Sequence, residues 1–160
     1  MFHEIRRRDR AITETEAWEI LAQSEWGVLS TLGEDGWPYG VPVNHVVLDG
    51  RIYLHCAQAG HKLENLAFES RVSYCAVASS EVLPAELSTN FESVVLFGRA
   101  IAVNDDTEKR RALEALLTRF APQHPAEGAE AMRTEFSRTT VVRITPDHIS
   151  GKARRDRPKH

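Results

Sequence analysis

Residues 27–46 read GVLSTLGEDGWPYGVPVNHV and contain two extended segments around one turn. Residues 26–32 are rich in apolar and β-branched side chains, which is typical of a strand, and the GEDG stretch at 33–36 turns the chain back into a second strand. That second segment carries Pro38 and Pro42. Because proline has no N–H to donate, we expect this strand to lie at a sheet edge, or to bend where the sheet opens.

The remaining elements alternate along the chain without a repeat. Asp49-Gly50 makes another tight turn. Further strands are predicted at 51–57, 71–79, 93–103 and 139–144, with 147–150 as a candidate for a last short one; helices are predicted from Thr13, over 61–69, from Asp105 to Phe120, and within 126–138. About six strands joined mainly by hairpins favour an antiparallel barrel or sandwich, mainly β with peripheral helices, over a doubly wound parallel sheet.

Composition indicates a single globular domain. The 160 residues are 42% hydrophobic and 27% charged, with a net charge of −3, which argues against broad nucleic-acid binding. We expect one domain over residues 1–150 and a basic, solvated tail over 151–160. No stretch is apolar enough for a membrane span and the amino terminus lacks a signal-peptide centre, so we expect a cytoplasmic protein without a membrane partner.

Metal and thiol chemistry are both disfavoured. His55 and Cys56 are neighbours on a predicted strand and therefore point to opposite faces, and no histidine pair has helical ligand spacing, so we predict no metal site. Cys56 and Cys75 lie within apolar strands, where nothing would lower the pKa of a thiol. We expect both cysteines to be buried and inert.

The stretch Gly60-His61-Lys62 stands at the predicted start of a short helix. Free N–H groups and the positive dipole end at such a position bind anions, and a lysine adds a point charge suited to phosphate. An ordinary turn with a solvated lysine is the alternative. A phosphate here and a flat ring against the proline-bent strand at 40–44 would match the shape of a flavin mononucleotide (FMN) site.

Several motifs occur in a familiar order over about 145 residues. They lie at 5–10 (IRRRDR), 27–46, 52–66 (IYLHCAQAGHKLENL), 72–77 (VSYCAV), 81–100 (EVLPAELSTNFESVVLFGRA) and 144–155 (ITPDHISGKARR). In these motifs the sequence resembles the FMN-binding split barrels of the pyridoxamine 5'-phosphate oxidase-like superfamily, most closely their nitroimidazole-resistance (Nim) branch.

The resemblance implies a six-stranded antiparallel split β-barrel that works as a homodimer with FMN at the subunit interface. It also implies a set of FMN contacts: the ring edge at Pro42, Val43 and Asn44, the ring and ribityl chain along His55, Cys56 and Ala57, the phosphate at His61 and Lys62 with Asn65 one turn further on, and Ser93, for which the second subunit is one source. His61 is in addition the candidate catalytic residue, as a proton donor.

The resemblance implies an FMN-dependent oxidoreductase, nitroreductase-like, acting on a small molecule such as a nitroaromatic. The chain lacks the arginine- and tryptophan-rich carboxyl-terminal region with which pyridoxamine phosphate oxidases grip their substrate, so we do not expect vitamin B6 oxidation. Two alternatives stay open. One is a split barrel that holds haem, with His45, His55 or His61 as axial ligand, or a deazaflavin; the other is a non-catalytic flavin- or ligand-binding protein.

Overall fold

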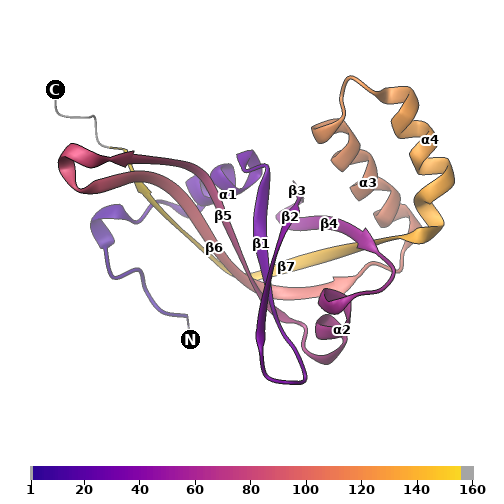
Figure 1. The fold of residues 1–160 in the computed structure, drawn as a ribbon, viewed down its shortest axis with the longest axis horizontal. Helices are drawn as coiled ribbons and strands as arrows, with labels where there is room; N and C mark the ends of the chain where they lie inside the picture. Colours follow the sequence, from indigo (N-terminus) through magenta and orange to yellow (C-terminus); the bar gives the residue numbers. More distant parts are fainter. Residues whose placement is uncertain (1, 156–160) are drawn as a thin grey trace.

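Seven antiparallel strands form one sheet in a computed structural model that describes residues 2–155. The order across the sheet is β2-β1-β5-β6-β7-β4-β3. The sheet curls into an open half-barrel, and helices stand around its rim (Figure 1). The predicted mainly β split barrel with peripheral helices is therefore confirmed, with one strand more than the six expected.

The elements follow the predicted order closely. The strands are β1 (Trp26–Leu32), β2 (Pro38–Asn44), β3 (Val46–Leu48), β4 (Arg51–Ala57), β5 (Arg71–Leu83), β6 (Ser88–Ala102) and β7 (Thr139–Arg154). The helices are α1 (Glu14–Gln23), α2 (His61–Phe68), α3 (Asp106–Phe120) and α4 (Pro125–Glu135), with three short 3-10 turns at Arg8–Arg10, Pro84–Glu86 and Phe136–Arg138.

The seventh strand arises because the second segment of the opening hairpin is broken at His45. Before the break, β2 pairs with β1 at one edge of the sheet; after it, β3 pairs with β4 at the other edge. The proline-containing strand is thus an edge strand, and the chain also bends just after it. Because the chain crosses at His45 from one edge to the other, the two edges are brought together there.

His45 is a structural residue, since its side chain is 0% exposed. Its Nε2 lies 2.8 Å from the carbonyl oxygen of Leu21 in α1, and its Nδ1 lies 2.9 Å from the hydroxyl of Tyr74 in β5. Nε2 must donate to the carbonyl. Burial lowers the pKa of His45 and so favours the neutral ring, in which Nδ1 accepts from the tyrosine hydroxyl. Considered above as a haem ligand, His45 is excluded because both ring nitrogens are occupied.

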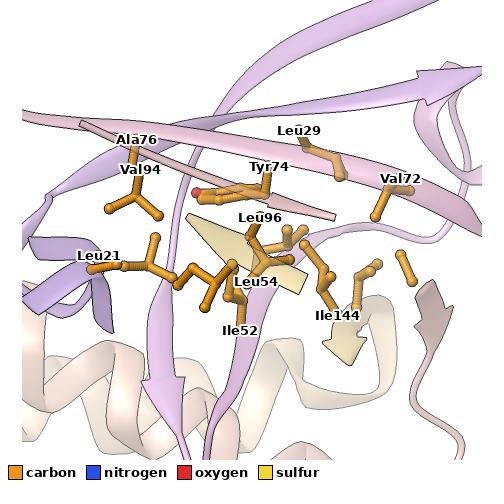
Figure 2. Packing of buried hydrophobic residues seen from close by; sticks show 14 of the residues in the cluster. Leu21, Leu29, Ile52, Leu54, Val72, Tyr74, Ala76, Val94, Leu96 and Ile144 are labelled. Carbon is orange, nitrogen blue, oxygen red and sulfur yellow. The ribbon is translucent and has the colours of Figure 1, made fainter. Parts of the chain in front are cut away.

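The main core fills the inside of the curled sheet, where side chains from α1 meet alternate residues of the strands. Those seen together in Figure 2 are Leu21, Leu29, Ile52, Leu54, Val72, Tyr74, Ala76, Val94, Leu96 and Ile144. Tyr74 lies so close to the backbone of β1 that a methyl group at Gly27 would overlap its ring. Glycine at this position therefore makes room for the core tyrosine.

A second, smaller core lies beneath α3 on the other side of β4 and β7. It contains Val46, Tyr53, Val103, Ala112, Leu113, Leu116 and Val141. Asp105 caps α3, accepting a 2.7 Å hydrogen bond from the amide of Glu108. The short helix predicted within 126–138 is confirmed as α4. The helix pair α3 and α4 stands over the ends of β4 and β7 (Figure 1).

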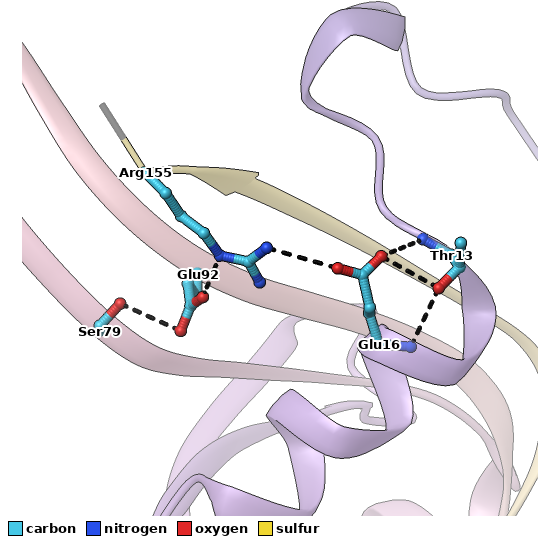
Figure 3. Close-up of polar contacts among 5 residues, drawn as sticks. All are labelled: Thr13, Glu16, Ser79, Glu92 and Arg155. Carbon is cyan, nitrogen blue, oxygen red and sulfur yellow. Dashed lines mark hydrogen bonds and ion pairs between the residues drawn. The ribbon is translucent and has the colours of Figure 1, made fainter. Parts of the chain in front are cut away.

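The capping box predicted at Thr13 is present: the amide of Glu16 donates to Thr13 Oγ1, and the amide of Thr13 donates to Glu16 Oε2. The other carboxylate oxygen of Glu16 pairs with Arg155 at 3.4 Å, and Arg155 also pairs with Glu92 on β6 at 2.5 Å (Figure 3). These contacts attach the start of α1 to the end of β7.

Two expectations about the carboxyl-terminal part differ from the structure. The separate strands predicted at 139–144 and 147–150 are one continuous strand, β7, because it pairs along its length with β6. The strand also runs to Arg154, past the predicted domain end at 150. Residues 156–160 of the predicted basic tail lie outside the described residues.

None of the helices within residues 2–155 is long and apolar enough to cross a lipid bilayer.

Candidate functional site

The start of α2 leaves backbone donors free. Gly60 precedes the helix at φ 132°, a conformation that favours glycine, and no side chain caps the helix. The carbonyl of Gly60 accepts from the amides of Leu63, at 2.8 Å, and Glu64, at 3.2 Å. Within residues 2–155 the amides of His61 and Lys62 make no hydrogen bond. Two parallel N–H groups at a helix start are suited to an anion.

The charge of Lys62, the second residue of α2, acts on two residues at the end of β4. Burial lowers the pKa of His55, and the Lys62 ammonium lowers it further. Burial raises the pKa of the Cys56 thiol, while the same ammonium opposes that rise. The structure therefore brings Lys62 together with His55 and Cys56. Under this balance the imidazole favours its neutral form and the thiol its protonated form. Cys56 and Cys75 are both half-buried rather than buried as expected, and their inertness stays a prediction.

The side chain of His61 has different neighbours. Its ring centroid lies 4.1 Å from that of Tyr39 on β2, at an interplanar angle of 33°. It borders a surface pocket of about 500 Å³ that also contains three acidic residues, Glu34, Asp35 and Glu64. These carboxylates disfavour an anion on that side of the helix. Of the two side chains expected to hold the phosphate, only that of His61 lines this acidic pocket, while the charge of Lys62 acts on the end of β4.

Asn65 attaches α2 to the sheet. It is 4% exposed, and its Nδ2 donates a 2.9 Å hydrogen bond to Thr31 Oγ1 on β1. The Thr31 hydroxyl in turn lies 3.4 Å from the carbonyl of Tyr39. This chain of contacts attaches α2 to both strands of the opening hairpin, so Asn65 sets where the open helix start lies.

The predicted ring-edge residues lie on β2 at the sheet edge. Pro42 pairs with Val28, and its side chain and that of Asn44 are exposed on the outside of the sheet. Val43 packs towards the core and offers only its backbone, whose carbonyl lies 3.3 Å from the Tyr74 hydroxyl. Asn44 donates from Nδ2 to the carbonyl of Glu25 at 2.9 Å. Its Oδ1 remains as an acceptor.

The predicted residues on β4 and β6 are not all brought together. His55, Cys56 and Ala57 end β4 beside β7, immediately before the turn into α2. Ser93 is on β6, where its cross-strand neighbours are Val77 and Lys152, and neither belongs to β4 or α2. The β5–β6 hairpin projects from the sheet on the side away from α2 (Figure 1). Within one chain, Ser93 is thus separate from the Lys62 cluster.

Two contributors to the site were missed from the sequence. Tyr39 meets His61 across 22 positions of the chain, and Thr31 meets Asn65 across 34. No local motif predicts either contact, because both depend on how α2 folds back against the hairpin. The alternation of side chains along β2 was the one usable signal, since it places Tyr39, Val41 and Val43 on a common face. The described residues contain no group of three or more histidine, cysteine, aspartate or glutamate side chains arranged to hold a metal ion.

The family described as pyridoxamine 5'-phosphate oxidase matches residues 13–153. No curated protein matches the chain. Many solved structures resemble it, including the following three, which all have low sequence identity to it. A candidate 5-nitroimidazole antibiotic resistance protein from Bacteroides thetaiotaomicron is 22% identical, with a TM-score of 0.73 over 89% of this chain and 85% of that one.

The other two neighbours carry haem or a flavin in their names. The flavocytochrome Anf3 from Azotobacter vinelandii is 21% identical, with a TM-score of 0.81 over 99% of this chain and 75% of that one. An FAD and heme binding protein from Mycobacterium smegmatis is 23% identical, with a TM-score of 0.78 over 92% and 74%. At these sequence identities the likeness establishes only a shared fold. The ligand of this chain has to be inferred from its own residues.

Proposed function

The chain belongs to the pyridoxamine 5'-phosphate oxidase family, and from that premise we propose that it is an FMN-binding oxidoreductase of the Nim type. The observation that carries the proposal is the start of α2. Two amides that make no hydrogen bond among the described residues, those of His61 and Lys62, open α2, and the charge of Lys62 acts on His55 at the end of β4. This arrangement fits a phosphate monoester placed next to a strand along which a chain and ring can lie.

In this proposal each predicted residue has a defined task. The amides of His61 and Lys62 and the Lys62 ammonium hold the phosphate, and Asn65 fixes the helix that presents them. His55, Cys56 and Ala57 on β4 would contact the ribityl chain and ring, and Pro42, Val43 and Asn44 on β2 would contact the ring edge. The flavin, when bound, supplies hydride or electron transfer, and the protein supplies placement and polarity.

His61 is proposed as the catalytic proton donor. Its imidazole contacts Tyr39 rather than Lys62, so holding the phosphate through its amide leaves the ring free for a second task. A ring nitrogen of His61 would deliver a proton to a substrate oxygen as the substrate is reduced. The ring borders a surface pocket that it shares with Glu34 and Glu64, so a substrate there would lie within reach of it.

We propose a homodimer with FMN at the interface because Ser93 cannot join the site within one chain. Large apolar side chains are exposed on the outer faces of β5 and β6, among them Val77 (43%), Phe97 (39%) and Ile101 (45%). A second copy packed on this face would cover them and would present its own Ser93 to the flavin. A monomer in sedimentation at micromolar concentration would contradict this part.

Purification and reconstitution test the proposal directly. We expect a yellow protein whose bound molecule is FMN by mass spectrometry, or an apoprotein that takes up FMN. Mixed without oxygen with reduced nicotinamide and a panel of nitroaromatics, the FMN-loaded protein should convert the acceptors. A colourless protein that takes up no FMN refutes flavin binding, whereas a flavoprotein that leaves every acceptor unchanged is a non-catalytic flavin- or ligand-binding protein.

Haem is the second candidate, because two structural neighbours are described as a flavocytochrome and as an FAD and heme binding protein. With His45 excluded, the axial ligand would be His55 or His61, both of which are on the surface. A Soret band in place of the two-band flavin spectrum would identify haem. A deazaflavin would occupy the same proposed site with a different ring system. Mass spectrometry of the bound molecule would identify it.

A further inference from the structure

An apolar groove of about 410 Å³ lies between the helix pair α3–α4 and the end of β4. Its walls come from the two helices and from the turn that follows α4, and its floor is made by β2, β4 and β7. His55 and Asn44 lie on the floor, and the walls include Leu117, Phe120, Ala131 and Phe136. The two floor residues are the same ones proposed to lie along the flavin.

The chemistry of the groove is specific. Glu135 is the one acidic or basic residue of its lining apart from His55, and apolar side chains dominate the walls. On the floor, burial and the Lys62 charge favour neutral His55, which has one donor and one acceptor nitrogen. The amide nitrogen of Asn44 already donates to the carbonyl of Glu25, so its oxygen, Oδ1, is the atom that could accept from a ligand. Apolar walls with few, placed polar groups are typical of a small-molecule site.

We propose that this groove binds the substrate, an uncharged aromatic molecule whose polar group is hydrogen-bonded by His55 and Asn44. The inference rests on the proposed function, because a ligand on this floor lies beside the strand that would carry the flavin ring. A charged substrate is disfavoured: its ion would lose water to apolar walls, and an anion would also meet Glu135. The volume matches the lower range of small-molecule pockets, which suits one or two rings.

Two probes of equal size test the charge preference: 4-nitrobenzamide, which is neutral, and 4-nitrobenzoate, which is an anion. Their dissociation constants are measured by calorimetry on the FMN-loaded protein and again without FMN. We expect 4-nitrobenzamide to bind at least about tenfold more tightly than 4-nitrobenzoate, a difference of about 1.4 kcal/mol in binding free energy. This comparison uses the unmodified protein, so it does not depend on whether any variant folds.

Two tryptophan variants on the same helix test the location. Ala131→Trp on α4 fills the groove, whereas Ala129→Trp, two positions earlier, points into a different hollow between α3 and α4. We expect Ala131→Trp to weaken 4-nitrobenzamide at least about tenfold and Ala129→Trp to change it no more than about twofold. Thermal unfolding of both variants shows that the difference is not a loss of fold.

Several outcomes would overturn the inference. Equal affinity for the two probes would remove the charge preference, and equal effects of the two variants would remove the location. If Ala131→Trp no longer bound FMN, the groove would be part of the flavin site itself. The same would follow if the wild-type protein held FAD and this variant held FMN instead. By contrast, a protein that takes up no flavin yet binds the amide in this groove would refute the proposed function alone and would support the groove as a ligand site.

Discussion

The side chain of Asn65 donates a 2.9 Å hydrogen bond to Thr31 Oγ1, and through it the helix with the open amides is attached to the first strand. Both side chains are buried, at 4% exposure each. A buried amide that donates to a buried hydroxyl holds the two elements at a fixed distance, since separating them leaves the amide without this acceptor. The position of the proposed phosphate site therefore depends on a contact outside it.

Replacing Asn65 by leucine should destabilise the protein by about 1–3 kcal/mol, because the size is kept but the partner of the buried Thr31 hydroxyl is lost. Chemical denaturation measures the loss. Glu64→Gln, one residue earlier on the exposed side of α2, is the matched control and should change little. If the two variants were equally stable, the hydrogen bond would not anchor the helix.

Replacing Lys62 by alanine should weaken FMN at least about tenfold while leaving riboflavin nearly unchanged, because only FMN carries a phosphate for the ammonium. Fluorescence quenching on titration with each flavin gives both affinities. Lys109→Ala on α3, whose ammonium lies over the Phe136 ring, removes an equal charge elsewhere. Equal losses of both flavins in the Lys62 variant would count against a phosphate site at α2.

Stability should fall as the pH drops below about 6.5. Burial lowers the pKa of His45 and of His55 from that value, so the unfolded chain takes up protons at a higher pH than the folded one. The contribution is complete above 6.5 and is lost on acidification, with a slope for His45 of at most about 1.4 kcal/mol per pH unit.

Urea unfolding from pH 7.5 to 5 measures this slope. His45→Gln should flatten the dependence, and His55→Gln should flatten it less because that ring is more exposed. Asp9 and Glu69, whose ion pairs lower their pKa values to about 2, act in a more acidic range and do not interfere. An unchanged slope in both variants would show that other groups titrate.

Replacing Gly27 by alanine should destabilise the protein by about 1–3 kcal/mol, because the new methyl group overlaps the Tyr74 ring at the centre of the core. In the control variant, Gly40→Ala on the paired strand, the new methyl group would lie 3.3 Å from Val28 Cγ1 and 3.8 Å from Ser30 Oγ, without overlapping either. Thermal unfolding compares the two. A larger loss for Gly40→Ala would contradict the packing at Gly27.

Replacing Thr13 by alanine should cost about 1 kcal/mol, the usual value for losing a helix cap. Arg155→Ala should have a smaller effect that disappears at high salt, because the guanidinium is half exposed and its ion pairs are screened (Figure 3). Unfolding at low and high ionic strength separates the two. A salt-dependent loss in the Thr13 variant would show that the capping box acts through charge.

Much of the fold was predictable because its signals are local. The hairpin at 27–46 follows from a turn flanked by apolar alternation, and the start of α1 follows from Thr13 and Glu16, which are three residues apart. The strand count was wrong by one, because only the packed structure shows that His45 turns inward between Leu21 and Tyr74. A histidine in a strand-like run gives no local sign of such burial.

The amino-acid sequence by itself determined the order of elements, the proline-marked edge strand and the helix start at Gly60. Each of these depends on residues a few positions apart, whose backbone preferences act before the chain is compact. Only the tertiary structure decided that His61 lies against Tyr39 and that α3 and α4 enclose a groove over β4. Both arrangements join segments far apart in the sequence, so no local preference of the chain could predict them.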